Sequence, residues 1–231
     1  MAIKAVVYDL DGTIVDTEGF HKVAWDLASE EYQLGFSGKE LVQASLGISS
    51  IKTLQKMLPS DRQDEYFIKK AAEAKFRYFM ELIETSNIEI MQGVVETFDR
   101  LRSDNLKVAI CTSARKENVE ALQRNRNSPI SQILESLEGK IAWKEMYQRG
   151  KPAAEPLLIA LDLIGIMPHQ SLYVGDAHPD YGCAMNAGTD FVYFWNKGSE
   201  REIKIPSNVV TIRDHRRLFD YLEGLKMLSG D

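Results

Sequence analysis

The chain has 231 residues and a mass of 26.2 kDa, which suits one large domain or one domain carrying a smaller insertion. Hydrophobic residues make up 44% and charged residues 27%, as in a soluble globular protein, which excludes disorder, collagen and coiled coil as the main state. Lysine and arginine number 28 against 34 acidic residues, a net charge of −6 without a basic run, so we expect no nucleic-acid partner.

The two cysteines bear on the cellular compartment. Cys111 and Cys183 form no disulfide framework and lack metal-ligand spacing, so we expect a reducing, cytoplasmic setting. Asp9 cuts short the apolar run at the N-terminus, which predicts that no signal peptide is present. No stretch approaches about 18 uncharged apolar residues, so we expect no membrane span and no membrane partner.

The first part of the chain is predicted to hold one strand followed only by helices. Residues 3–10 form a short apolar run that ends in the turn signal Asp-Gly-Thr, which is typical of a buried strand. Nothing between about residues 18 and 86 has the pattern of a strand. Helices are predicted over about residues 20–34, 50–58 and 67–82. A further helix is predicted to begin at the capping box formed by Ser37 and Glu40.

The second part alternates short apolar runs with amphipathic segments. Such alternation indicates a parallel sheet with helices on both of its faces. Strands are predicted at 107–112, 141–143, 172–175, 191–194 and 209–212, and helices at 94–102, 116–124, 153–164, 179–186 and in a last segment holding Leu218, Leu222 and Leu225.

The long helical stretch exceeds an ordinary crossover connection between two strands, so we interpret it as an insertion. The predicted fold is therefore α/β: a Rossmann-like, doubly wound parallel sheet with an inserted helical-bundle cap domain. The predicted core comprises residues 1–16 and 88–231, and the predicted cap comprises residues 17–87.

Candidate site residues are those that follow the predicted strands, because ligands of open parallel sheets bind at the carboxyl ends of the strands. Singly, each is weak evidence, since Asp-x-Asp pairs are common in turns, lysines are ordinarily solvated, and carboxylates often cap helices. Their expected meeting at one edge of one sheet makes them a candidate site. These residues are Asp9, Asp11, Gly12, Thr13, Thr112, Ser113, Lys151, Asp176 and Asp180.

The residue types in this set indicate phosphoryl chemistry. Several carboxylates at one sheet edge would repel one another unless a cation lay among them, and hard oxygen ligands suit Mg²⁺ as cofactor. A lysine and a hydroxyl group that face the same point suit a phosphate oxygen. Gly12 stands at the wrong position for an EF-hand loop, and the sequence lacks both G-x-x-x-x-G-K-[ST] and G-x-G-x-x-G after a strand.

Four motifs, in order, resemble those of the haloacid dehalogenase superfamily. Asp9-Leu10-Asp11-Gly12-Thr13 resembles the first, Thr112 the second, Lys151-Pro152 the third, and Gly175-Asp176 with Asp180 the fourth. The helical insertion after the first motif is similar to the cap of the phosphoglycolate phosphatase and β-phosphoglucomutase branch. The dehalogenases themselves lack the second aspartate, which is present here as Asp11.

The resemblance implies a role for each acidic residue. Asp9 would be the nucleophile that forms an aspartyl-phosphate, and Asp11 the general acid that later acts as the base. Mg²⁺ would bind the Asp9 carboxylate, the Asp11 backbone carbonyl and Asp176. Asp180 would support these ligands by hydrogen bonding.

The phosphate group would be held by other parts of the motifs. Lys151 and the Thr112 hydroxyl would bind its oxygens, and Gly12 would let the backbone come close to it. Three residues depart from the family's common pattern without removing a charged group: Gln92, Ala154 and Ala177.

Substrate choice in the resembling branch depends largely on the cap. His21 matches a position that lies near the acid/base aspartate in relatives, and Arg115 matches a cation that contacts the non-reacting end of some substrates, with Ser113 nearby. In the mutases, an arginine in the loop corresponding to residues 46–50 grips a second phosphate. Ser50 stands at that position, which favours a phosphatase.

The expected function is Mg²⁺-dependent hydrolysis of a small phosphorylated metabolite, phosphoglycolate or a sugar phosphate, by a monomer or a homodimer. A β-phosphoglucomutase-like phosphomutase is the alternative. A phospho-acceptor signalling domain is a remote one, because receiver domains are much shorter and lack the helical insertion. A phosphonate hydrolase would need a cap lysine that the sequence does not locate. His215 lies among three arginines and is not expected to belong to the site.

Overall fold

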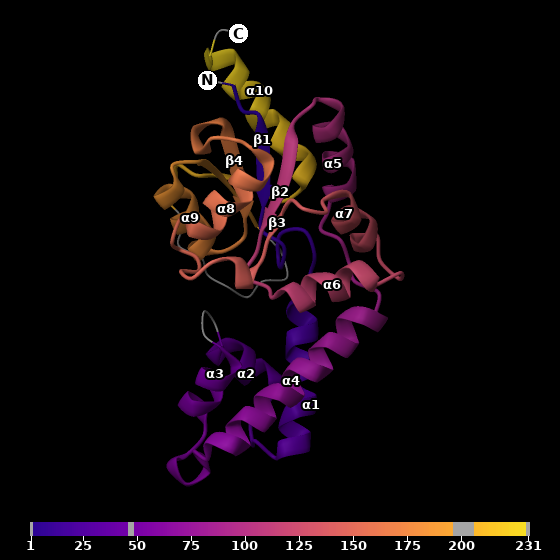
Figure 1. The fold of residues 1–231 in the computed structure, drawn as a ribbon, viewed down its shortest axis with the longest axis vertical. Coiled ribbons are helices and arrows are strands. Elements are labelled where there is room, and N and C mark those ends of the chain that lie inside the picture. The colour runs from indigo at the N-terminus through magenta and orange to yellow at the C-terminus, as the bar shows by residue number, and fades with distance from the viewer. Residues whose placement is uncertain (1, 46–48, 196–205, 230–231) are drawn as a thin grey trace. The chain divides into compact units, whose positions relative to one another are not determined.

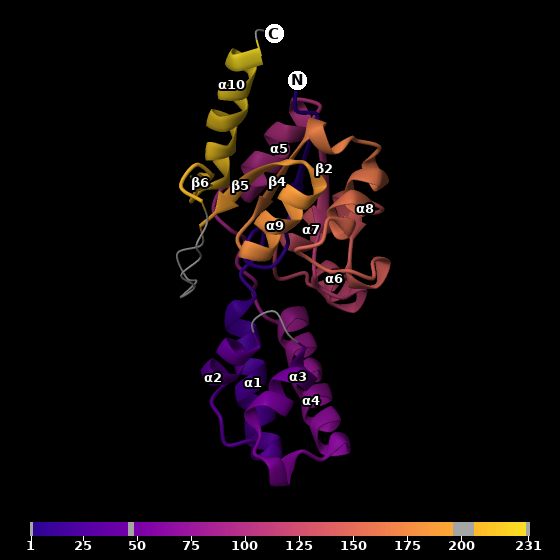
Figure 2. The same cartoon turned by 90° about the vertical axis from the view of Figure 1, so that its left-hand side faces the viewer.

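Six parallel strands form one sheet in the order β3-β2-β1-β4-β5-β6 in the computed structural model, which describes residues 2–45, 49–195 and 206–229. This is the strand order of a doubly wound α/β fold, so the predicted fold class is confirmed. Figure 1 shows the strands β1 (Ala5–Tyr8), β2 (Lys107–Cys111), β3 (Ile141–Ala142) and β4 (Ser171–Gly175), and Figure 2 also shows β5 (Asp190–Phe194) and β6 (Val210–Ile212).

The first strand, β1, lies in the middle of the sheet between β2 and β4. Its last residue, Tyr8, is aligned with Ile110 of β2 and Val174 of β4. The residues that follow these three strands therefore emerge at the same edge of the sheet. Asp9 is held there by its backbone N–H, which donates to the Val174 carbonyl at 2.9 Å. The register thus gathers the ends of three strands where ligands of such sheets bind.

One face of the sheet is covered by α8 (Glu155–Ile164) and α9 (His178–Ala187). Alternate residues of the strands point to this face, and Val7, Ala109 and Tyr173 are buried together with apolar residues of the two helices. Figure 2 shows α8 and α9 in front of the sheet and α5 behind it. The central strand β1 is apolar and buried along its whole length because both faces of the sheet are covered.

The opposite face is covered by α5 (Val94–Ser103), with α10 (Leu218–Ser229) beside it. The ring of Tyr8 lies 4.9 Å from that of Phe98 in α5. The guanidinium group of Arg100 in α5 lies 3.8 Å from the ring centre of Phe219 in α10. The end of β1 is therefore packed by aromatic side chains just before the chain reaches Asp9.

Residues Thr17–Asn87 form a compact unit whose described elements are all helical. Trp25 is 1% exposed and packs in this unit's own apolar core. The predicted capping box is confirmed, because the Glu40 N–H donates to the Ser37 hydroxyl at 3.3 Å and the Glu40 carboxylate accepts the Ser37 N–H at 2.8 Å. The helices are α1 (Glu18–Tyr32), α2 (Gly38–Ala44), α3 (Ser50–Met57) and α4 (Glu65–Thr85).

The chain leaves and re-enters the larger unit, Met1–Asp16 with Ile88–Asp231, at neighbouring points. The Asp16 N–H donates to the Glu89 carbonyl at 3.2 Å, so the outgoing and returning segments are hydrogen-bonded to each other. Among the described residues, no helix combines the length and the apolar character needed to cross a membrane.

Two local features differ from the sequence-based expectation. A helix, α7 (Ile130–Ser136), was not predicted, because seven residues after Pro129 are too few to display a helical period. The helix α8 begins at Glu155 rather than at residue 153, and Lys151 lies in the turn before it.

Candidate active site

Asp9 and Asp180 share one buried lysine. Lys151 Nζ donates to Asp9 Oδ1 at 2.6 Å and to Asp180 Oδ1 at 2.7 Å, and the lysine side chain is 4% exposed. Burial alone would lower the pKa of Lys151, but the two carboxylates reverse this effect and hold the pKa well above its usual value. Lys151 is therefore a fixed positive charge at the end of β1.

Asp176 completes a cluster of three buried carboxylates with Asp9 and Asp180. One oxygen of each carboxylate lies within 4.8 Å of the others. Burial raises the pKa of the Asp9 carboxyl well above its usual value, and the charges of Asp180 and Asp176 add to this, although Lys151 opposes it. One ammonium group thus does not compensate three carboxylates, and a divalent cation with oxygen ligands fits the donor set.

The turn after β1 is fitted closely against Asp176. The Thr13 hydroxyl donates to Asp176 Oδ1 at 3.0 Å, and both residues are buried. Gly12 has a φ of +84°, and a Cβ there would lie 2.4 Å from Asp176 Oδ2. Only glycine combines this backbone conformation with this closeness. The turn therefore fixes where the Asp176 carboxylate points.

Both carboxylate oxygens of Asp180 accept hydrogen bonds from the protein. Oδ1 accepts the Tyr173 hydroxyl at 2.9 Å in addition to Lys151, and Oδ2 accepts the Ala177 N–H at 3.0 Å. The last bond belongs to the start of α9, so the helix-capping role of this carboxylate is real. The arrangement makes Asp180 a fixed support for Lys151.

Thr112 follows β2 at the same edge of the sheet and is 1% exposed. Its Oγ1 accepts the Ala114 N–H at 3.0 Å, and its backbone carbonyl accepts the Tyr147 hydroxyl at 3.0 Å. These bonds orient the threonine hydroxyl, whose own hydrogen is suited to donation to an anion. The hydrogen bond from Tyr147 thereby stabilises the loop after β2.

The other core candidates lie in the loops after β1 and β2. Asp11 is half-buried in the turn that follows Asp9. Ser113 and Arg115 are exposed in the loop between β2 and α6 (Lys116–Arg124), with Arg115 immediately before the helix. The structure thus brings the core candidates to the carboxyl edge of the sheet, as their order along the chain predicted.

Two candidates belong to the helical unit. His21 on α1 stacks on Phe79 at 4.0 Å, and its Nδ1 lies 2.9 Å from the Nζ of Lys75, a buried lysine of α4. Ser50 is the first residue of α3 and is half-buried. Of the predicted substrate loop, residues 46–48 lie outside the described residues.

A family model described as haloacid dehalogenase-like hydrolase matches residues 6–194, which include all of the core motif residues. The chain is a haloacid dehalogenase-like hydrolase. The predicted superfamily is thereby confirmed, and the enzyme class is that of a hydrolase.

Curated relatives of this hydrolase include enzymes named for phosphate-ester substrates. The protein CbbY of Rhodobacter capsulatus is 28% identical over 81% of this chain and 83% of its own. A phosphorylated carbohydrates phosphatase of Thermotoga maritima is 25% identical over 83% of this chain and 84% of its own. A phosphoglycolate phosphatase of Salmonella typhimurium is 26% identical over 88% of this chain and 87% of its own.

Solved structures with the same fold include both a hydrolase and a mutase. A family IA, variant 3 hydrolase of Entamoeba histolytica has a TM-score of 0.78 at 21% identity, over 96% of this chain and 100% of its own. A β-phosphoglucomutase of Clostridium difficile has a TM-score of 0.69 at 22% identity, over 96% of both chains. The fold is therefore common to enzymes of both kinds.

Thr13 was a candidate in the sequence, whereas two tyrosines that shape the hydrolase's site were not. Thr13 lies within the first motif, but its bond to Asp176 depends on a turn that the sequence does not display. Tyr173 and Tyr147 lie in or near buried segments, and their hydroxyl groups reach Asp180 and Thr112. A tyrosine within a wholly buried strand was the available signal, because its hydroxyl requires a partner.

His215, which was not expected to belong to the site, is 0% exposed although its neighbours Arg213, Arg216 and Arg217 are exposed. Its Nε2 lies 2.8 Å from the carbonyl of Thr13, and its ring stacks on that of Phe194 at 4.2 Å. Burial lowers the pKa of His215 to about 4, against the smaller opposing effects of its bond to Thr13 and of the Asp214 charge.

This buried histidine is expected to make the hydrolase lose stability in mild acid. The folded-state pKa of about 4 lies below the unfolded value of 6.5, so between these values the unfolded chain binds more protons. The free energy of unfolding should therefore fall as the pH drops through that window, by about 3 kcal/mol at its lower end. Urea unfolding at several pH values, compared between the wild type and His215→Phe, isolates this contribution. Equal pH slopes in the two proteins would contradict it.

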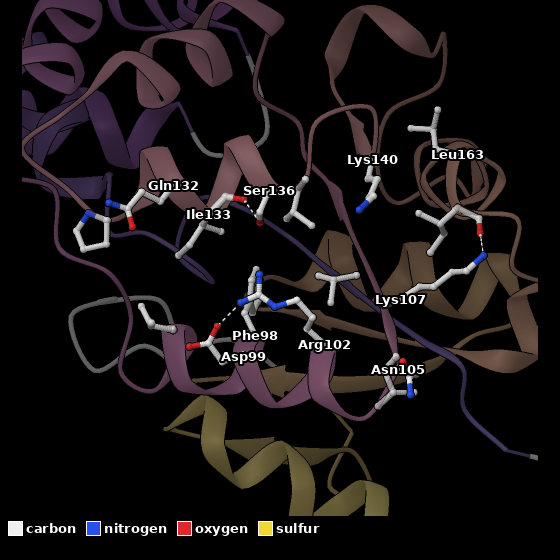
Figure 3. A pocket seen from close by; sticks show the side chains of 16 residues that line it. Phe98, Asp99, Arg102, Asn105, Lys107, Gln132, Ile133, Ser136, Lys140 and Leu163 are labelled. Carbon is white, nitrogen blue, oxygen red and sulfur yellow. Dashed lines mark hydrogen bonds and ion pairs between the residues drawn. The ribbon is translucent and has the colours of Figure 1, made fainter.

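A hollow of about 690 Å³ lies at the other end of β2, between α5, α7 and α8 (Figure 3). Two of its cations have partners: Arg102 is paired with Asp99, and Lys107 Nζ donates to the Ile164 carbonyl at 2.6 Å. Lys107 begins β2, whereas the carboxylate cluster lies at the strand ends. The hollow is therefore separate from the candidate active site.

Proposed function

We propose that the protein is a Mg²⁺-dependent phosphatase that hydrolyses a small phosphorylated metabolite, phosphoglycolate or a sugar phosphate. The observation that carries this proposal is the cluster of three buried carboxylates that shares the single ammonium of Lys151. The carboxylates suit a divalent cation, and that cation together with the Lys151 ammonium suits a phosphate group. Relatives named for phosphoglycolate and for phosphorylated carbohydrates support the substrate class.

The proposed reaction has two displacements at phosphorus. A carboxylate oxygen of Asp9 attacks the phosphorus atom and the ester oxygen leaves, taking a proton from Asp11, so that an aspartyl-phosphate and an alcohol are formed. Asp11 then takes a proton from water, whose oxygen attacks the same phosphorus. Inorganic phosphate leaves and the Asp9 carboxylate is restored.

The charges of the site suit these displacements. The Asp9 and Asp176 carboxylates and the Asp11 backbone carbonyl would hold Mg²⁺, with Asp180 supporting them through its bonds to Lys151 and Tyr173. Bound there, Mg²⁺ would offset the repulsion between the Asp9 carboxylate and the phosphate dianion. The Lys151 ammonium and the Thr112 hydroxyl would bind the phosphate oxygens through the transfer.

Residues 17–87 are proposed to act as the cap that selects the substrate, with His21 and Ser50 as its candidate contacts. From the core, Gly12, Ser113 and Arg115 would contact the phosphate or the rest of the metabolite. The two buried, free cysteines suit a reducing compartment, so we place the activity in the cytoplasm, in a monomer or a homodimer.

Phosphate release from a panel of metabolites tests the proposal. Phosphoglycolate, hexose phosphates, glycerol phosphate and nucleoside monophosphates, with p-nitrophenyl phosphate as a general control, are assayed with Mg²⁺ and with EDTA. We expect release that requires Mg²⁺ and favours phosphoglycolate or a sugar phosphate. Isomerisation of β-glucose 1-phosphate in place of phosphate release would identify the protein as a mutase. Release that persists in EDTA would contradict the metal dependence.

A further inference from the structure

His215 joins two segments that flank the inserted helical unit. Its ring Nε2 lies 2.8 Å from the carbonyl of Thr13, in the turn after β1. Its backbone N–H donates to the carbonyl of Gln92, just before α5, at 3.0 Å. One residue from the C-terminal part of the chain thus holds the turn of the first motif and the segment on which the chain returns to the larger unit.

The chemistry of the ring fixes its protonation. A carbonyl oxygen only accepts hydrogen bonds, so Nε2 carries the hydrogen and donates it to Thr13. Nδ1 is buried and has no hydrogen-bond partner within the described part of the chain, which suits the neutral ring. The ring stacks on Phe194 at 4.2 Å and lies 5.7 Å from the ring of Tyr8. The donor is therefore held in one orientation.

The turn that carries His215 is itself rigidly placed. The Asp214 carboxylate accepts the Arg216 backbone N–H at 3.0 Å and also binds the guanidinium group of Arg216. Gly93 has a φ of +82°, and a Cβ there would lie 2.2 Å from Asp214 Oδ1. The turn is thus seated directly on the returning segment, with no space for even a methyl group between them.

Thr13 is bound at both of its polar ends. Its carbonyl accepts from His215, and its hydroxyl donates to Asp176 Oδ1 at 3.0 Å. We propose that His215 is a positioning residue that holds Thr13 and, through Thr13, the orientation of the Asp176 carboxylate. The inference rests on the proposed function, in which Asp176 is a ligand of Mg²⁺.

The test compares two variants of His215 in the full chain. In His215→Phe the ring remains but the donor is lost, whereas in His215→Gln the side-chain amide can donate to the same carbonyl. Mg²⁺ affinity is measured by titration calorimetry without substrate. We expect His215→Phe to weaken Mg²⁺ binding by about tenfold and His215→Gln to recover most of it. At saturating substrate, kcat should follow the same order, with KM changed by less than about twofold.

Leu218→Ala is the matched control, because Leu218 is 0% exposed at the start of α10, next to the turn, and serves only packing there. It should lower the melting temperature and leave Mg²⁺ affinity unchanged. Mg²⁺ affinity of His215→Phe within about twofold of the wild type would overturn the proposal, as would an equal loss in Leu218→Ala.

A measurement on the wild type decides the matter if His215→Phe does not fold. The ring ¹⁵N signal of His215 should shift when Mg²⁺ alone is added, while that of His169, an exposed histidine, stays in place. No shift at His215 overturns the proposal. A wild type that releases no phosphate from any compound but shows these Mg²⁺ effects refutes the proposed function alone, and one that binds no Mg²⁺ refutes both.

Discussion

Asp9→Asn should lower kcat for phosphate release by at least about 10³-fold while the protein stays folded. An amide has nearly the shape of the carboxylate but is not a nucleophile toward phosphorus. Because burial and the charges of Asp180 and Asp176 raise the pKa of Asp9, removing its charge should not lower the melting temperature at pH 7. The measurements are initial rates on the best substrate of the panel and thermal unfolding followed by circular dichroism.

Asp162→Asn is the matched control, since Asp162 is exposed on α8 and the same chemical change there should leave kcat unaltered. Activity of Asp9→Asn within tenfold of the wild type would refute the nucleophile. Intact-mass measurement adds a direct view of the intermediate, because Asp11→Asn should slow its hydrolysis. If a phosphoryl adduct appears in neither the wild type nor Asp11→Asn, the covalent route is wrong.

Lys151→Met should have the second largest effect, on both activity and stability. Loss of the ammonium removes a charge that would bind the transferred phosphate, which is expected to lower kcat by about 10³-fold. It also leaves Asp9 and Asp180 without their shared partner, at 2.6 and 2.7 Å in the wild type. Uncompensated buried charges of this kind cost about 3 kcal/mol, or a fall of about 10 °C in melting temperature.

The stability loss in Lys151→Met should respond to conditions that neutralise the carboxylates. Mg²⁺ should restore much of it, and the loss should shrink as the pH is lowered, because the pKa of Asp9 is already raised and its carboxyl becomes neutral more readily. Lys4→Met serves as the control, because Lys4 is an exposed lysine just before β1. This substitution should change neither kcat nor the melting temperature. A melting temperature of Lys151→Met equal to that of the wild type, without Mg²⁺ at pH 7, would contradict this account.

The fold could be predicted from the sequence because its elements carry strong local signals. The strand at β1 is an apolar run stopped by Asp-Gly, and the helix α2 starts with a capping box that the structure contains. Asp9, Thr112 and Asp176 follow the ends of β1, β2 and β4. They therefore lie at the same edge of the sheet, as the parallel arrangement of these strands requires.

What could not be predicted depends on packing between distant segments. The helix α7 is short, and it is buried against α6 rather than marked by its own period. His215 lies among exposed arginines, and only the fold shows it beneath Phe194 and against Thr13. The bond from Tyr173 to Asp180 likewise joins a strand to a helix across a sheet face. Long-range contacts of this kind have no local signature in the sequence.

The central place of β1 has a consequence for how the enzyme is made. The strand is synthesised first, but its neighbours in the sheet begin only at Lys107 and Ser171. At roughly 5–20 residues per second, the ribosome completes the contiguous helical unit, Thr17–Asn87, seconds before β1 gains its second partner. The nascent chain can therefore build its helical core early, whereas the edge that carries Asp9 is assembled only after three-quarters of the protein has been translated.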